Sequence, residues 1–100
     1  MKLTNEFEPI REWAEAKGIY EHGDPKTQYL KLVTEVAEIA DALLDEDEAE
    51  FQDGVADATI VLVNLAKLKG YNLEDCINDA YKVIAKRKGK MINGTFVKNE

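Results

Sequence analysis

The chain has 100 residues, twenty acidic and thirteen basic, with a formal net charge of −7 and an apolar fraction of 45%. These values are typical of one globular domain over residues 1–100, and the negative charge disfavours broad nucleic-acid binding or docking on an anionic membrane. The longest uncharged run, residues 58–66, is far shorter than a membrane-spanning helix, and the first six residues contain no apolar signal core, so we expect a cytoplasmic protein.

The first half of the chain predicts two amphipathic helices. Apolar residues recur at three- and four-residue spacing over residues 5–17, which a glycine ends, and a loop is expected over residues 19–23. A second helix begins after Asp24, an N-cap residue, with Pro25 in the first position, and ends before the acidic run 45–48. The apolar stripe expected to face the core consists of Leu30, Val33, Ala37, Ala40 and Leu44.

The third predicted helix, over residues 49–69, is apolar on nearly every side from Val55 onward. Such a helix must be covered all round, and a chain of this size has too little material to do so alone. We therefore expect an all-α, four-helix bundle-like domain that assembles as a homodimer or homotetramer.

The fourth predicted helix begins after Asn72 and becomes basic toward its end. Its expected inward residues are Leu73, Cys76, Ile77, Ala80 and Ile84. Because Cys76 is the sole cysteine, neither an internal disulfide nor a zinc site is expected. The short C-terminal tail, residues 91–97, has an Asn-Gly turn between apolar pieces, which favours a small hairpin or packing on a neighbour.

Four carboxylates are the candidates for chemistry. Asp57 lies in the apolar stretch of the third helix, where an ionised, unpaired carboxylate would cost several kcal/mol. Asp53 lies one turn earlier on the same face, and Glu35 and Glu38 share a flank of the second helix. Because the short acidic connection favours antiparallel packing of these two helices, the carboxylates are expected to converge.

Oxygen ligands without histidine or cysteine select hard cations. Mg²⁺ is therefore the expected metal, with Mn²⁺ as a substitute, whereas Ca²⁺ is disfavoured because no EF-hand loop is present. Magnesium keeps open positions that phosphate oxygens fill. A phosphorylated substrate is the expected partner.

These motifs resemble a known family. The Glu35-x-x-Glu38 pair, the acidic connection, and the acid and Asp57 before an apolar helix are similar to the MazG-like all-α nucleoside triphosphate pyrophosphatases. Segments 10–14, 28–33 and 87–94 resemble the short single-domain members of phages and bacteria. The resemblance implies hydrolysis of a nucleoside triphosphate between the α and β phosphates, which gives the monophosphate and pyrophosphate.

The resemblance also implies roles for individual residues. Glu35, Glu38, Asp53 and Asp57 are expected to hold Mg²⁺ at the triphosphate, and Glu35 or Glu38 to help deprotonate the attacking water. The expected substrate-binding residues are Trp13, Gln28, Lys31, Lys82, Lys86 and Arg87. Trp13 equally fits a packing role, and the basic end of the fourth helix equally fits the dipole of that helix.

Two positions depart from the family pattern of Glu-x-x-Glu followed by Glu-x-x-Asp. A further glutamate before the first pair is replaced by Thr34, and Gly54 stands three residues before Asp57, with the carboxylate moved to Asp53. The literal match Glu50-x-x-Asp53 is the competing register and leaves Asp57 unexplained.

Two other classes of function remain compatible with the sequence. One is a non-catalytic, oligomeric helical module whose acidic faces bind basic partners. The other is a different magnesium-dependent phosphohydrolase that acts on other nucleotides or on metabolites that contain pyrophosphate. Metal-dependent turnover separates the first class from an enzyme, and product analysis separates the second.

Overall fold

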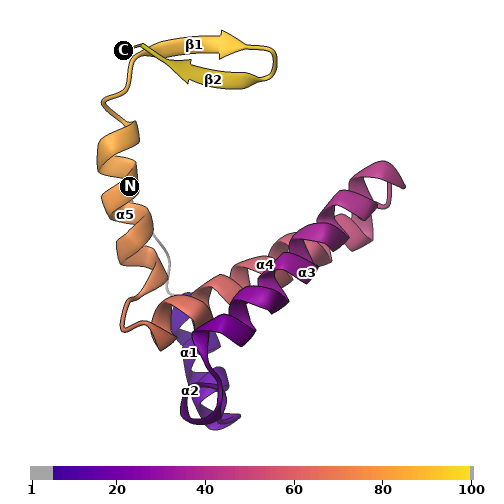
Figure 1. Ribbon diagram of the computed structural model, residues 1–100, viewed down its shortest axis with the longest axis vertical. Helices are drawn as coiled ribbons and strands as arrows, with labels where there is room; N and C mark the ends of the chain where they lie inside the picture. The colour runs from indigo at the N-terminus through magenta and orange to yellow at the C-terminus, as the bar shows by residue number, and fades with distance from the viewer. Residues whose placement is uncertain (1–5, 100) are drawn as a thin grey trace.

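Five helices and one β-hairpin make up residues 6–99, the part of the chain that this computed structural model describes (Figure 1). In chain order the elements are α1 (Phe7–Ala16), α2 (Ile19–His22), α3 (Pro25–Leu44), α4 (Glu48–Leu68), α5 (Leu73–Ile84), β1 (Gly89–Ile92) and β2 (Thr95–Lys98). The mainly helical class and the four longer helices confirm the expectation from periodicity. The loop expected over residues 19–23 is wrong, because Gly18 adopts φ 81° and lets the chain enter the short helix α2.

The antiparallel pair α3 and α4 is the longest part of the fold. Asp24 caps α3 as expected, because its carboxylate accepts from the Thr27 amide at 2.9 Å, and Asp47 caps α4 through the Glu50 amide at 3.1 Å. Gly54 is buried where the helices approach, and a Cβ built on it would lie 2.9 Å from Cγ1 of Ile39. The missing side chain therefore permits the close contact between the two helices.

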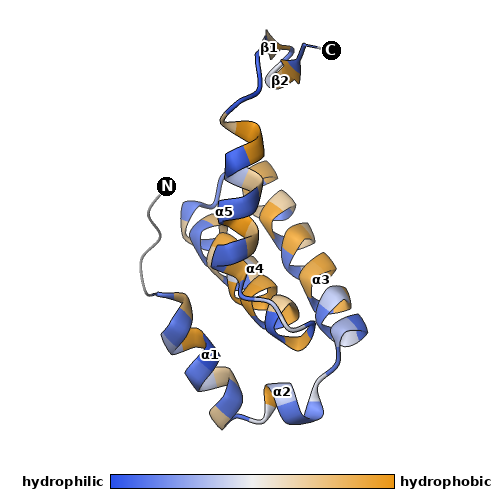
Figure 2. Cartoon of the chain, turned by 90° about the vertical axis from the view of Figure 1, so that its left-hand side faces the viewer, coloured by the Kyte–Doolittle hydropathy of each residue, from blue (hydrophilic) through white to orange (hydrophobic). Residues whose placement is uncertain are grey.

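The expected core stripe of α3 faces outward. Its members Leu30, Val33, Ala37, Ala40 and Leu44 are all exposed. The face of α3 that meets α4 instead carries Leu32, Glu35, Ile39 and Ala42. The prediction was wrong because α3 has apolar residues on two faces, and within one chain α4 covers one of them. Figure 2 shows the hydrophobic residues that run along α3 and α4.

A buried arginine on α1 forms an ion pair with a glutamate at the start of α5. Arg11 donates from Nη1 to Oε1 of Glu74 at 2.8 Å and from Nη2 to Oε2 at 2.5 Å, and it also bonds the neighbouring Glu8. The Arg11 side chain is 7% exposed, that of Glu74 24% and that of Glu8 58%. The hydrogen bonds from Arg11 hold the pKa of the Glu74 carboxyl below its usual value, while burial partly opposes them.

Beyond this anchor, α5 and the hairpin extend away from the other helices (Figure 1). No residue of α5 is buried; of its expected inward positions Leu73 and Ile77 are half-buried, and Cys76, Ala80 and Ile84 are exposed. The hairpin pairs Lys90 with Val97 and Met91 with Phe96, and its turn places Asn93 and Gly94 at positive φ, as the Asn-Gly sequence favours. Every strand residue is exposed. The tail therefore forms the hairpin that was one of its two expected structures.

Small side chains dominate the core. Its buried apolar residues are Ala14, Ala42, Ala58, Val61 and Val63. No helix within residues 6–99 combines the length and the hydropathy that crossing a bilayer requires.

Candidate functional site

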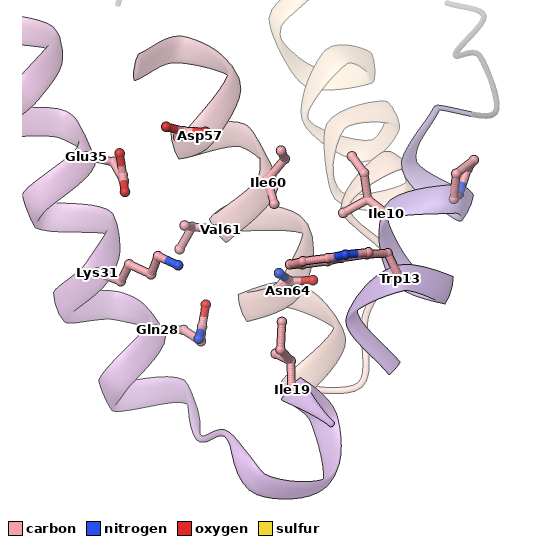
Figure 3. Close-up of a pocket in the computed structure, with 11 residues that line it drawn as sticks. Ile10, Trp13, Ile19, Gln28, Lys31, Glu35, Asp57, Ile60, Val61 and Asn64 are labelled. Atoms are coloured by element: carbon pink, nitrogen blue, oxygen red, sulfur yellow. The ribbon is translucent and has the colours of Figure 1, made fainter. Parts of the chain in front are cut away.

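A pocket of about 530 Å³ lies where α1, α2, α3 and α4 meet (Figure 3). Its walls are mostly apolar, and a small number of polar side chains converge on it. The lining residues are Pro9, Ile10, Trp13, Ile19, Gln28, Lys31, Glu35, Asp57, Ile60, Val61 and Asn64. An apolar pocket with a few convergent polar groups is the usual form of a small-molecule site.

Two of the expected carboxylates face each other at this pocket. Glu35 projects from α3 toward α4, and Asp57 projects from α4 toward α3 at the same level (Figure 3). Oε2 of Glu35 is buried and has no hydrogen-bond partner. Burial raises the pKa of the Glu35 carboxyl, the nearby carboxylates of Glu38 and Asp57 raise it further, and Lys31 lowers it. Glu35 is therefore partly removed from water and lies close to two other acidic side chains, Glu38 and Asp57.

The buried carboxyl oxygen belongs to Glu35 rather than to Asp57. The sequence places Asp57 in an apolar stretch and predicts its burial, yet the residue is exposed within one chain. The prediction was wrong because other elements of the chain cover only part of α4. Asp57 nevertheless lines the pocket and adds to the negative charge around Glu35.

Three expected substrate-binding residues line the same pocket. Lys31 and Gln28 lie on α3, one and two turns before Glu35, and both point into the space beside α4 (Figure 3). Trp13 extends from α1 toward Asn64 on α4 and is 52% exposed. An aromatic ring, a cation and an amide therefore lie on one side of the carboxylate pair.

Asn64, which lines the pocket, is hydrogen-bonded to Tyr20. Asn64 is buried, and its Oδ1 accepts a hydrogen bond from the Tyr20 hydroxyl at 2.7 Å, which joins α2 to α4. Burial raises the pKa of the Tyr20 hydroxyl. Sequence analysis missed Tyr20 and Ile19 because it predicted a loop there. The apolar-polar pattern of residues 19–22 is too short to predict a helix.

The other expected metal ligands lie outside the pocket lining. Glu38 is exposed beside Glu35, and Asp53 is exposed one turn before Asp57 on α4. Within residues 6–99, no three Asp, Glu, His or Cys side chains are grouped closely enough to hold a metal ion. The structure thus places Glu38 and Asp57 near Glu35, but it does not form the expected metal-binding cluster of four carboxylates or a cluster of three of them.

The expected phosphate-binding cations of the C-terminal region lie elsewhere in the chain. Lys82 and Lys86 line a second hollow together with Asn78, Tyr81 and Ala85. Arg87 is exposed just beyond α5. Within one chain these side chains do not reach the pocket that contains Glu35.

The chain is 31% identical over 58 residues to an uncharacterized 18.2 kDa protein in the rep-hol intergenic region of Haemophilus phage HP1. The match covers 58% of this chain and 36% of the phage protein, so the chain spans about a third of the length of this relative. No known protein family matches the chain, and no solved structure matches it significantly.

Proposed function

We propose that this chain is a magnesium-dependent nucleoside triphosphate pyrophosphohydrolase of the MazG-like type. The observation that carries the proposal is the buried, unpartnered Oε2 of Glu35, which lies opposite Asp57 at an apolar pocket. An ionised carboxylate in that position is partly removed from water and lies near other carboxylates, and a bound cation would offset both effects. The triphosphate of a nucleotide beside it would need one as well.

The donor set of the pocket suits a hard divalent cation. Glu35 and Asp57, which both line the pocket, would hold it. Mg²⁺ commonly binds through one or two carboxylates and fills its remaining positions with water and phosphate oxygens, so a complete protein cage is not required. Mn²⁺ is the expected substitute. When bound, the ion would neutralise charge between the carboxylates and the triphosphate oxygens.

The remaining pocket residues match the parts of a nucleotide. The ring of Trp13 offers a flat apolar surface for the base, beside the apolar walls from Ile10 and Ile60. Lys31 can donate to phosphate oxygens. Glu35 or Glu38 is the candidate general base for the water that attacks the α-phosphorus.

The exposed stripe of α3 supports assembly into a homo-oligomer. Leu30 and Val33 are exposed on a helix face that nothing in the described chain covers, and Val55 is exposed on α4. Burial of such side chains in an interface would remove their apolar area from water. A four-helix arrangement built from the α3–α4 pairs of two chains is therefore the proposed bundle.

Product analysis tests the proposed reaction. The protein is incubated with Mg²⁺ and each canonical ribo- and deoxyribonucleoside triphosphate, and phosphorus NMR identifies the products. Monophosphate together with pyrophosphate is expected, and release of single orthophosphate would contradict the position of cleavage.

Glu35→Gln should reduce the rate by roughly 100-fold or more. Glu12→Gln, on the exposed side of α1, is the matched control and should leave it unchanged. Absence of any metal-dependent turnover would favour the non-catalytic helical module.

A further inference from the structure

Two segments of opposite charge protrude from the fold. The basic arm, residues 82–98, contains six basic and no acidic residues, namely Lys82, Lys86, Arg87, Lys88, Lys90 and Lys98. The acidic tip, residues 41–53, contains seven acidic and no basic residues, namely Asp41, Asp45, Glu46, Asp47, Glu48, Glu50 and Asp53. A chain with a net charge of −7 thus separates its charges into two strongly opposed patches.

The two patches do not meet within one chain. The molecule is shaped like a V, with the paired helices α3 and α4 as one limb and α5 with the hairpin as the other (Figure 1). The acidic tip lies at the far end of the first limb, and the basic arm forms the far part of the second. Each patch is therefore free to contact another molecule.

Both patches also expose large apolar side chains next to their charges. Leu44 on the acidic tip is 82% exposed, and Met91 on the basic arm is 66% exposed. Leu43 on the tip, and Val83 and Phe96 on the arm, are exposed as well. Apolar residues bordered by charge are typical of protein–protein contacts rather than of a solvated surface.

The surface area of the chain fits an uncovered interface. The chain exposes 7806 Å², whereas a compact monomer of 11.3 kDa exposes about 5,700 Å². Its radius of gyration is 15.9 Å, compared with about 13 Å for a compact domain of 100 residues. The excess of about 2,100 Å² lies within the range that one subunit of an obligate dimer buries.

We propose that the basic arm of each chain docks on the acidic tip of a second copy, and that the reverse contact forms at the same time. The same arm-to-tip contact then occurs twice about a two-fold axis, which gives a closed, self-complementary pair. The inference rests on the homo-oligomer proposed above and adds a second contact to it, between the basic arm and the acidic tip. It does not depend on catalysis, so the two proposals can fail separately.

Charge reversal with complementation tests this contact. The tip variant is Asp41→Lys with Asp45→Lys; cations in the last turn of a helix suit its dipole, so α3 should still fold. The arm variant is Lys88→Glu with Lys90→Glu, both at exposed positions. The control is Glu12→Lys with Glu21→Lys, exposed on α1 and α2. Circular dichroism verifies the helix content of each variant, and analytical ultracentrifugation measures self-association at low and high salt.

The proposal predicts a pattern across the variants. Either reversal alone should weaken self-association about tenfold or more, and the control should not. An equimolar mixture of the tip and arm variants should associate more tightly than either variant alone, because one of the two contacts in the mixed pair then joins an unaltered arm to an unaltered tip. The proposal would be overturned if the protein is a monomer at all concentrations, or if neither the reversals nor salt change its self-association. It would also be overturned if the mixture associates no better than the single variants.

Discussion

Replacing Glu74 with glutamine should reveal how strongly the buried ion pair holds α1 against α5. Arg11 and Glu74 lie 63 residues apart in the sequence and form two parallel hydrogen bonds, so the pair joins distant parts of the chain. Removing one partner of a fully buried ion pair costs about 3–5 kcal/mol. Here Glu74 is partly exposed, Arg11 keeps Glu8, and the glutamine can still accept one hydrogen bond. We therefore expect a loss of about 2 kcal/mol in the free energy of unfolding.

Urea denaturation at a fixed protein concentration measures this loss as a shift of the midpoint by about 1–2 M. The pH dependence supplies a second check. Because the pKa of Glu74 is lowered in the folded chain, its contribution is present above the ordinary value of 4.5 and is lost as the pH falls through the lowered folded value. The difference between the unaltered protein and Glu74→Gln should thus be full at pH 7 and shrink under acidic conditions.

Glu8→Gln is the matched control, because Glu8 bonds the same guanidinium from an exposed, local position. Its expected cost is below about 1 kcal/mol. Equal losses for Glu8→Gln and Glu74→Gln, or a gap for Glu74→Gln that persists undiminished at pH 3, would refute the reasoning.

Three further substitutions test the packing and the charge of the site. Tyr20→Phe removes the hydrogen bond to buried Asn64 and should cost about 1–2 kcal/mol in urea denaturation; an unchanged midpoint would mean that water replaces the bond. Gly54→Ala brings a methyl group against Ile39 and should cost about 1–2 kcal/mol net of the better helix propensity of alanine, and a gain in stability would contradict the close contact. Glu35→Gln should raise the melting temperature at pH 8 without metal and leave it unchanged at pH 4. Because the pKa of Glu35 is raised in the folded chain, the unaltered protein has its full stability below the ordinary value of 4.5 and loses some of it as the pH rises through the folded value, whereas glutamine does not ionise. A lower melting temperature at pH 8 would show that ionised Glu35 is stabilised in the apo chain.

Local sequence signals predict the helices well. The cap at Asp24 followed by Pro25 marks the start of α3, and the glycine at position 18 marks the end of α1. These signals act within one or two helical turns, so they do not depend on the tertiary packing. The short α2 is missed because four residues contain too little periodicity.

Which face of each helix is buried is a tertiary property that the periodicity does not decide. On α3 both Leu30 and Ile39 lie on apolar faces, and the contact with Gly54 selects the face with Ile39. The same limit applies to the site. The spacing brings Glu35 and Asp57 to one pocket as expected, but it assigns the burial to Asp57, whereas the buried oxygen belongs to Glu35.

Titration with Mn²⁺ tests most directly whether Glu35 and Asp57 hold a hard divalent cation. Free Mn²⁺ is followed by its electron paramagnetic resonance signal while protein is added in the presence of a nonhydrolysable nucleoside triphosphate. The account predicts that the protein increases binding beyond that of the nucleotide alone, that Glu35→Gln and Asp57→Asn each abolish the increase, and that Asp79→Asn on exposed α5 does not. Binding that is unchanged in both Glu35→Gln and Asp57→Asn would contradict it.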